Sequence, residues 1–233
     1  NYKETKSSSF SENISAQAAI LVDIKSNNVL YAKNENKHMY PASTTKLMTA
    51  LTVLQIMNVN DVVTIGDEIT FIASDSSKAG FSRGQVVTVK ELLQGLLISS
   101  GNDAAYVLAK AAGQEIFEDN IANEGKTFTS QQCVQRFVLE MNRNVRDMEL
   151  ENTHFTSPDG YDDDDQYTTA TDLSKIAIEA YSNSVIADIC GKSSAYSDTL
   201  SKTWTSTNAL LNKNGSFYYE YCQGLKTGST GLA

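Results

Sequence analysis

The order in which secondary-structure patterns follow one another limits the fold of this chain more than any other feature. Strand patterns occur early, at 17–23 and 29–32, and the stretch 193–230 alternates like strands again. Between them, apolar residues recur at helical spacing. A helical middle flanked by strands predicts an α+β fold, in which a central antiparallel sheet is built from both chain ends and a helical cluster packs on it.

Size and charge narrow the class of protein. The chain has 233 residues, 41% of them hydrophobic, so a full core can form. Residues 1–15 are polar and serine-rich and are expected to be a flexible leader before a domain at 16–233. The net charge of -9 argues against a nucleic-acid partner, whose phosphates bind lysine and arginine clusters. No apolar run reaches membrane-spanning length, and the start at Asn1 suggests a processed or engineered start from which any export signal has been removed.

The first predicted helix places a serine at its N-terminus. Leu47, Leu51 and Leu54 recur at helical spacing, so this helix should be buried and should hold Ser43 rigidly. Ser43 and Lys46 are three residues apart and would lie one turn apart on the same face. Since a neighbouring base turns a weak hydroxyl into a strong nucleophile, this pair is a candidate catalytic centre.

A polar corner is predicted between two later helices. The capping-box pattern at 88–91 begins one helix, which should end at the glycine of Ser100-Gly101-Asn102. Asn102 opens an alanine-rich helix that we expect to reach about Gly113. The corner can therefore present a hydroxyl and an amide to a cleft. Beyond it we expect an exposed acidic excursion at 115–130, then helices over about 131–147, from about 171, and over part of 184–191.

Lys226-Thr227-Gly228 adds a third group of polar residues near the C-terminus. A cation and a hydroxyl suit a carboxylate, and a glycine lets a substrate backbone lie close along a strand. Together with the serine–lysine pair and the corner, this is the equipment for acyl transfer on a substrate that ends in a carboxylate. A strand with this motif needs a neighbour on its far side, so we expect further sequence after Ala233.

The three motifs, in this order and at these separations, resemble those of the penicillin-recognising serine enzymes, the β-lactamases and penicillin-binding proteins. Four longer passages narrow the resemblance to the low-molecular-mass D-alanyl-D-alanine carboxypeptidases. It runs from about residue 15 to the end and implies a β-lactamase/transpeptidase-like fold, with 16–233 as the transpeptidase-like catalytic domain and no cofactor or metal. The four passages are Tyr40–Ala50, Leu92–Ala105, Asn152–Gly160 and Gly224–Thr230.

The resemblance implies a role for each motif residue. Ser43 would attack the carbonyl between two terminal D-alanines, with Lys46 as its base, and water would later hydrolyse the acyl-enzyme. Ser100 would pass a proton to the departing D-alanine. The backbone N–H groups of Ser43 and Ser229 would form an oxyanion hole. The residues implied in substrate binding are Asn102, Lys226, Thr227, Gly228 and Ser229.

The resemblance also implies partners and a location. The substrate would be a peptidoglycan stem peptide ending in D-Ala-D-Ala, and β-lactam antibiotics would acylate Ser43 and stall there. The protein would act outside the cytoplasm, secreted or at the outer face of the bacterial cytoplasmic membrane. Any membrane anchoring would come from sequence that is not part of this chain.

Two other functions fit the same motifs. A serine β-lactamase would hydrolyse its acyl-enzyme quickly, and some use a glutamate in a Glu-x-x-Leu-Asn pattern that this chain lacks. A non-catalytic β-lactam sensor or wall-binding module would keep Ser43 and acylate without turning over peptide. Release of D-alanine separates the enzyme from the sensor.

Other polar groups have structural interpretations. His154 with Asp159 or Asp172 would suggest a Ser-His-Asp triad, but Lys46 already supplies the base, so we expect His154 to pin its loop. The acidic run at 162–165 lacks the ligand spacing of a calcium loop and should be solvated.

Cysteines and tyrosines receive structural interpretations as well. Tyr218, Tyr219 and Tyr221 should alternate across a strand. An odd number of scattered cysteines predicts neither a disulfide framework nor a metal site. These cysteines are Cys133, Cys190 and Cys222.

Overall fold

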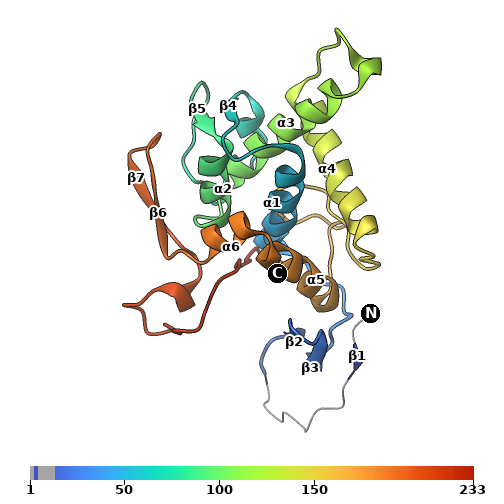
Figure 1. Ribbon diagram of the computed structural model, residues 1–233, viewed down its shortest axis with the longest axis vertical. Coiled ribbons are helices and arrows are strands. Elements are labelled where there is room, and N and C mark those ends of the chain that lie inside the picture. Colours follow the sequence, from blue (N-terminus) through green and yellow to red (C-terminus); the bar gives the residue numbers. More distant parts are fainter. Residues whose placement is uncertain (1–2, 5–13) are drawn as a thin grey trace.

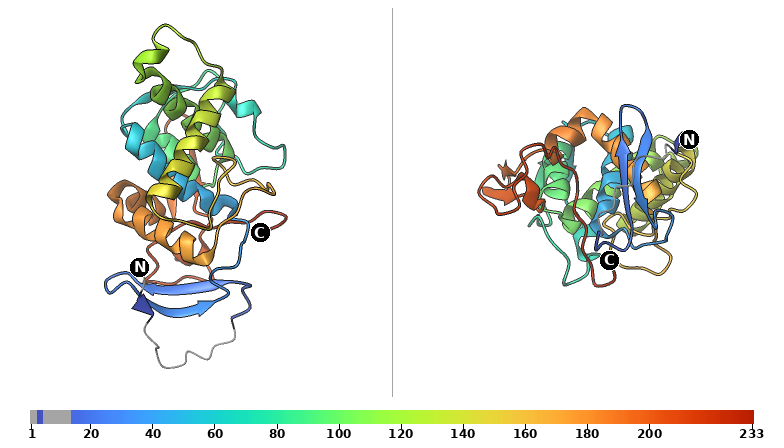
Figure 2. Two further views of the ribbon diagram at one scale, coloured as in Figure 1. Left: turned by 90° about the vertical axis from the view of Figure 1, so that its right-hand side faces the viewer. Right: turned by 90° about the horizontal axis from the view of Figure 1, so that it is seen from below.

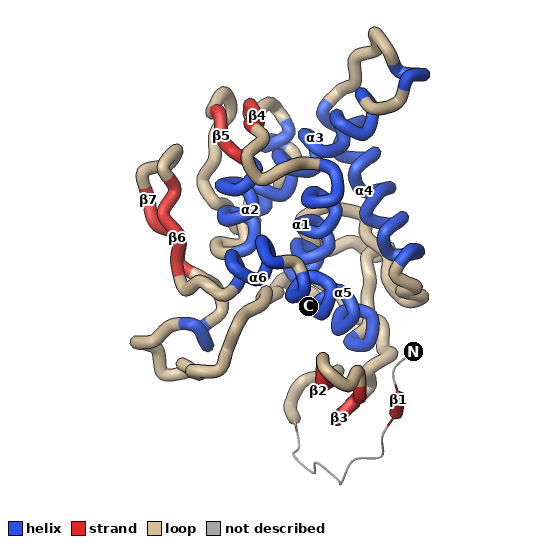
Figure 3. The backbone as a smooth tube through the Cα atoms, in the orientation of Figure 1, coloured by secondary structure: helices blue, strands red, loops and turns tan. Residues whose placement is uncertain are grey.

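The computed structural model describes residues 3–4 and 14–233, so most of the leader predicted at 1–15 lies outside the described residues. Helices gather in the centre and small sheets lie around them, which confirms the α+β class (Figures 1 and 3). The α-helices are α1 (Thr45–Ile56), α2 (Val89–Leu97), α3 (Asn102–Glu118), α4 (Ser130–Asp147), α5 (Ala170–Ser182) and α6 (Ser184–Cys190).

The strands form three separate small sheets in the described part of the chain, with orders β1-β3-β2, β4-β5 and β6-β7. Four short 3₁₀ turns join the helices and strands there. The strands are β1 (Lys3–Glu4), β2 (Ala19–Asp23), β3 (Asn28–Lys33), β4 (Val62–Thr64), β5 (Val86–Thr88), β6 (Ser194–Ser197) and β7 (Lys202–Thr205). The turns are η1 (Ala42–Thr44), η2 (Glu68–Thr70), η3 (Ile121–Asn123) and η4 (Ala209–Leu211).

Helix α1 lies at the centre of the molecule (Figure 1). All of its residues from 45 to 53 are buried, because α2, α3, α4, α5 and α6 all contact it. A helix that is apolar around most of its circumference is stable only inside a core. The predicted burial of this helix is therefore confirmed, and its N-terminus is held firmly.

The sheet differs from the one predicted from both chain ends. In the described residues it contains β2 antiparallel to β3 and β1 parallel to β3, and β2 contacts α5 (Figure 2). The segment after Gly224 forms no ladder with it, and residues of both, among them Ile20, Val22 and Leu225, line one apolar groove. The segment packs instead on η1, where a Cβ at Gly228 would lie 3.1 Å from the Pro41 oxygen.

Helix α3 continues to Glu118, beyond the end predicted near Gly113. Gly113 does not stop the helix. A Cβ at this position would lie 1.9 Å from the backbone oxygen of Cys133 in α4, so the glycine permits close helix–helix approach. The predicted excursion is correspondingly shorter, and Phe117 stacks on Phe128 across its base at 3.9 Å.

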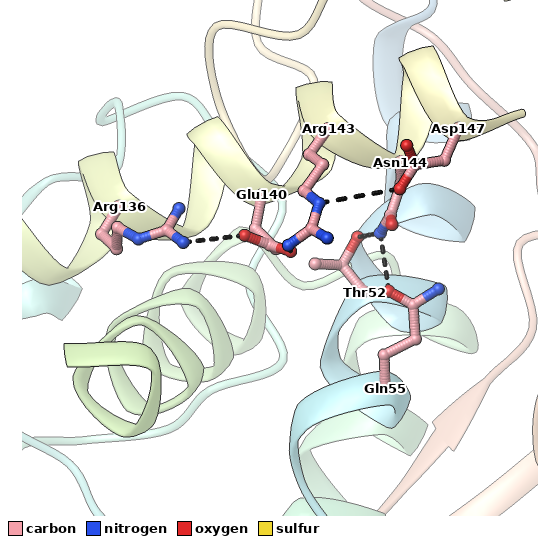
Figure 4. Close-up of polar contacts among 7 residues, drawn as sticks. All are labelled: Thr52, Gln55, Arg136, Glu140, Arg143, Asn144 and Asp147. Atoms are coloured by element: carbon pink, nitrogen blue, oxygen red, sulfur yellow. Dashed lines mark hydrogen bonds and ion pairs between the residues drawn. The ribbon is translucent and has the colours of Figure 1, made fainter. Parts of the chain in front are cut away.

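Helix α4 has two different faces (Figure 4). Its outer face carries ion pairs along the helix, such as Arg136–Glu140 at 2.9 Å, which contribute little to stability at a surface. Its inner face carries Asn144, whose amide donates to Thr52 Oγ1 at 2.9 Å and to Gln55 Oε1 at 2.8 Å in α1. The buried amide thus ties α4 to the central helix.

The stretch between α4 and α5 is irregular, as predicted, but firmly anchored. Asn142 donates to the Phe155 oxygen at 2.7 Å and accepts from the Phe155 N–H at 3.0 Å. The same part of the stretch is also held by α5, in which Asp172 accepts from the Thr153 hydroxyl at 2.9 Å. This stretch, residues 148–169, is called the α4–α5 loop below.

The predicted strands of 193–230 are realised only in β6 and β7. Tyr218, Tyr219 and Tyr221 lie in turns and irregular chain and are exposed, so their predicted strand alternation is wrong. Their segment has no partner strand in the described residues to pair with.

All three cysteines are free, and burial raises the pKa of Cys190 to about 12.

Two features are absent from the described residues. No helix there combines the length and the apolarity that crossing a bilayer would require. No cluster of His, Cys, Asp and Glu side chains in residues 3–4 and 14–233 could hold a metal ion.

Candidate active site

Ser43 and Lys46 lie together at the start of the central helix. Ser43 is in η1 and Lys46 in the first turn of α1, with Lys46 Nζ 2.8 Å from Ser43 Oγ. Lys46 is fully buried, and its amine also donates to Asn102 Oδ1 at 2.8 Å and to the Asp159 oxygen at 2.7 Å. Three oxygens from three segments of the chain therefore fix this amine in place.

The surroundings of Lys46 change its proton affinity. Burial lowers the pKa of Lys46 from 10.5 to about 7, because a charged amine is costly to remove from water. The nearby Lys226 lowers the pKa further, while Asp159 and Asp103 raise it. A large fraction of Lys46 is therefore neutral near pH 7 and able to accept a proton.

The corner between α2 and α3 presents Ser100 to the site. Lys226 Nζ donates to Ser100 Oγ at 2.9 Å, and Ser77 Oγ donates to the Ser100 backbone oxygen at 2.6 Å. Ser100 has a φ of 61°, a left-handed conformation that costs energy in a non-glycine residue and is frequent at functional sites. Ser99 turns away and donates to the Gly95 oxygen at 2.8 Å.

Asp103 braces this corner, although sequence reasoning assigned it no role. Its buried carboxylate accepts from the N–H groups of Ala79, Gly80 and Phe81 at 2.7 to 3.0 Å. A Cβ at Gly101 would lie 2.8 Å from the Ala79 nitrogen, so the corner and this segment are in close contact. The only signal in the sequence was an acidic residue in the first turn of a helix.

Lys226 approaches the site from the C-terminal segment. Burial lowers the pKa of Lys226 from 10.5 to about 8. Its amine also donates to the Thr227 backbone oxygen at 2.8 Å, and the Thr227 hydroxyl lies 2.6 Å from the Thr207 hydroxyl. The close approach of Gly228 to η1 brings this segment beside the turn that contains Ser43.

One cleft is lined by three of the predicted site residues. It is lined by Ser43, Asn102 and Ser229, so three segments that are distant in sequence face the same space. Lys46 lies behind this lining and donates to Ser43 and Asn102. Ser100, Lys226, Thr227 and Gly228 are not part of the lining, and Gly228 borders a neighbouring pocket. Three acidic residues line the same cleft: Asp75, Asp159 and Asp162.

The α4–α5 loop directly contacts η1, the turn that contains Ser43. Gly160 has a φ of 83°. A Cβ there would lie 1.9 Å from the Ala42 oxygen and 2.7 Å from Thr45 Oγ1. Only glycine combines this backbone conformation with so close an approach. The loop thereby brings Asp159 next to Lys46.

His154 does not take part in a triad with Ser43. Its Nδ1 lies 2.7 Å from the Asp165 oxygen, and its backbone forms a bridge with Tyr167. The prediction that His154 pins its loop is confirmed. His38 lies nearby on the surface, with its ring stacked on Tyr167 at 4.5 Å.

The chain matches one family model and several curated relatives. The family model of D-alanyl-D-alanine carboxypeptidase matches residues 3–121 and 131–233. The chain is 30% identical over 226 residues to the D-alanyl-D-alanine carboxypeptidase DacF of Bacillus subtilis, covering 94% of this chain and 52% of the relative. It is 34% identical over 212 residues to the D-alanyl-D-alanine carboxypeptidase of Streptomyces sp. strain K15, covering 86% and 67%. The chain spans about half the length of several curated relatives that it matches.

Solved structures show the same fold. The crystal structure of the Streptomyces K15 DD-transpeptidase superposes with a TM-score of 0.83 at 32% identity, covering 95% of this chain and 83% of that chain. The D-alanyl-D-alanine carboxypeptidase from Mycobacterium tuberculosis superposes with a TM-score of 0.76 at 30% identity, covering 93% and 74%. The predicted β-lactamase/transpeptidase-like fold is confirmed.

Proposed function

Since the chain belongs to the D-alanyl-D-alanine carboxypeptidase family of serine peptidases, we propose that it removes the terminal D-alanine from peptidoglycan stem peptides through an acyl-enzyme on Ser43. The observation that supports this most strongly is the buried Lys46 amine, 2.8 Å from Ser43 Oγ. A lysine with its pKa lowered to about 7 beside a serine is suited to be a general base.

In the proposed acylation step, neutral Lys46 removes the hydroxyl proton of Ser43. Ser43 Oγ forms a bond to the carbonyl carbon between the two terminal D-alanines. The carbonyl oxygen becomes negatively charged in the tetrahedral intermediate, and the backbone N–H groups of Ser43 and Ser229 would stabilise it. Asn102 holds the base and lines the cleft beside the substrate.

In the next step the carbon–nitrogen bond breaks and D-alanine leaves. Ser100, which lies 2.9 Å from Lys226 Nζ, would pass a proton to the leaving nitrogen. Lys226 and Thr227 would hold the carboxylate of the departing D-alanine. Water then hydrolyses the ester on Ser43 and releases the shortened peptide. A β-lactam would acylate the same oxygen, and its fragment would stay attached.

The proposed substrate also determines the proposed place of action. Stem peptides belong to the cell wall, so we place the protein outside the cytoplasm, secreted or at the outer face of the cytoplasmic membrane. No cofactor enters any step of this mechanism.

The test is D-alanine release from a peptide ending in D-Ala-D-Ala, with intact-mass detection of the penicillin adduct. We expect D-alanine release and one long-lived adduct per chain, both lost in Ser43→Ala. An adduct without D-alanine release would support a β-lactam sensor or wall-binding module instead. Consumption of penicillin without a lasting adduct would support a serine β-lactamase.

A further inference from the structure

Asp159 belongs to none of the three motifs, yet it contacts both the base and the amide beside it. Its side chain is buried at 2% exposure. The main-chain oxygen accepts from Lys46 Nζ at 2.7 Å. The carboxylate accepts from Asn102 Nδ2 at 2.7 Å and from the Tyr161 N–H at 3.1 Å. Both carboxylate oxygens thus face N–H donors, as an ionised carboxylate requires.

A carboxylate at this position determines which way the Asn102 amide faces. Because an ionised carboxylate can only accept, Asn102 must turn its NH₂ group toward Asp159 and its Oδ1 toward Lys46. A neutral Lys46 amine has two N–H groups, and the Asn102 and Asp159 oxygens at 2.8 and 2.7 Å accept both. The lone pair that remains is directed at Ser43, whose Oγ lies 2.8 Å away.

We propose that Asp159 is a positioning residue for acylation: through Asn102 it directs the lone pair of Lys46 at Ser43. This inference rests on the proposed function, since it concerns the acyl-transfer step. The Asp159 carboxylate acts through Asn102, and the main-chain oxygen of the same residue contacts Lys46 Nζ.

The charges around Lys46 give the direction of the effect. Asp159 from the α4–α5 loop and Asp103 from α3 raise the pKa of Lys46, whereas Lys226 from the C-terminal segment lowers it. Among these charges Asp159 has the largest effect. Tyr106 of α3 also faces this carboxylate, and its pKa is raised by burial and then by Asp159. Removing the carboxylate should therefore lower the pKa of Lys46 further.

The test is the pH dependence of the second-order rate of penicillin acylation in the intact protein and in Asp159→Asn. In each profile the rate should fall on the acid side as Lys46 becomes protonated, and we call this fall the acid limb. We expect the acid limb of the variant to lie at a pH lower by about one unit. We also expect its plateau rate to fall about tenfold or more, because an amide at 159 no longer fixes the orientation of Asn102. Superimposable profiles would overturn the proposal.

A matched control separates charge from loop anchoring. Asp172 is also a buried carboxylate, and it anchors the same loop by accepting from Asn152 N–H and Thr153 Oγ1, both at 2.9 Å. Asp172→Asn should lower the unfolding temperature and leave the acid limb where it is. If Asp172→Asn moved the acid limb as far as Asp159→Asn, the effect would belong to loop loosening, and the proposal would be wrong.

A double variant tests whether Asp159 acts through Asn102. In an Asn102→Ala background, adding Asp159→Asn should still shift the acid limb but should not lower the plateau rate further. A further tenfold fall in the plateau would contradict the positioning role. If Asp159→Asn shows no cooperative thermal unfolding, the smaller Asp159→Ser removes the same charge, and its acid limb is judged by the same outcomes.

The outcomes distinguish this inference from the proposed function. A wild-type protein that is not acylated at any pH contradicts the proposed function. Normal acylation of the wild type with an unchanged profile in Asp159→Asn contradicts only the role of Asp159.

Discussion

At the scale of single residues, two buried lysines should limit the working pH range from opposite sides. Lys46 must be neutral to accept a proton, so activity should fall below its pKa of about 7. Lys226 must be charged to hold a carboxylate, so activity should fall above its pKa of about 8. We expect a bell-shaped profile of kcat/KM for a D-Ala-D-Ala peptide, with its maximum between these values. A profile that stays flat from pH 6 to 9 would contradict both assignments.

A substitution assigns the alkaline limb. Arginine stays protonated throughout the accessible pH range, so Lys226→Arg should keep its charge where lysine loses it. The variant should retain some activity and lose the alkaline limb, while the acid limb remains near 7 because Lys46 is unchanged. An alkaline limb that persisted near 8 in this variant would belong to another group.

The sequence predicts some of these residues and not others, for a physical reason. Ser43 and Lys46 are three residues apart on one helix, so local geometry alone brings them together. Asp159 and Asn102 are 57 residues apart, and only the packing of the α4–α5 loop on η1 makes them neighbours. The role proposed here for Asp159 therefore could not be foreseen from spacing.

At the scale of elements, the contact between α3 and α4 depends on one glycine. A methyl group at Gly113 would overlap the Cys133 oxygen at 1.9 Å, so Gly113→Ala must push the helices apart. We expect it to lower the free energy of unfolding by about 3 kcal/mol, measured by urea denaturation.

Gly125 is the matched control for this prediction. Nothing lies within 4 Å of a Cβ at that position, although its φ is 74°. Gly125→Ala should therefore cost about 1 kcal/mol, from backbone strain alone. Equal costs at Gly113 and Gly125 would show that close packing of α3 on α4 is not the cause.

Two errors in the predicted elements share a cause. The sequence predicts a helix end near Gly113, but α3 continues past this glycine, which allows α4 to pack closely on α3. Glu91 fits a capping box with Thr88, and the Thr88 hydroxyl does cap α2 by accepting from the Glu91 N–H at 3.2 Å. The Glu91 carboxylate turns instead to Thr199, more than 100 residues away, at 2.7 Å. Local patterns predicted the start of α2 correctly but not these long-range partners.

At the scale of the whole molecule, the candidate site exists only because distant segments are held together. Ser43, Ser100 and Lys226 come from three segments, and Asp159 comes from a fourth. The class of fold could be predicted from the order of elements. The single sheet predicted from both chain ends differs from the separate small sheets of the described residues. Alternation in 193–230 indicates strands, but it does not indicate which strand edge each of them pairs with.

The β6–β7 hairpin gives a test of whether residues 16–233 unfold as one unit. Its Trp204, the only tryptophan, is buried, packs at a tilt against Phe81 and donates to the Ala79 oxygen at 2.9 Å. Glu91 of α2 holds the hairpin's connecting turn through Thr199. Tryptophan fluorescence reports the hairpin and far-UV circular dichroism reports the helices, so the two urea transitions should coincide.

Removing one attachment should separate these transitions. Glu91→Ala deletes the carboxylate that receives the Thr199 N–H and hydroxyl at 3.0 and 2.7 Å. The hairpin should then detach first, and the fluorescence midpoint should move to lower urea than the dichroism midpoint. Separate transitions in the wild type would mean that the hairpin is an independent unit.

Detachment of the hairpin should also slow acylation of Ser43. Trp204 packs on the segment that Asp103 holds against the Ser100 corner, so losing this contact should loosen the corner.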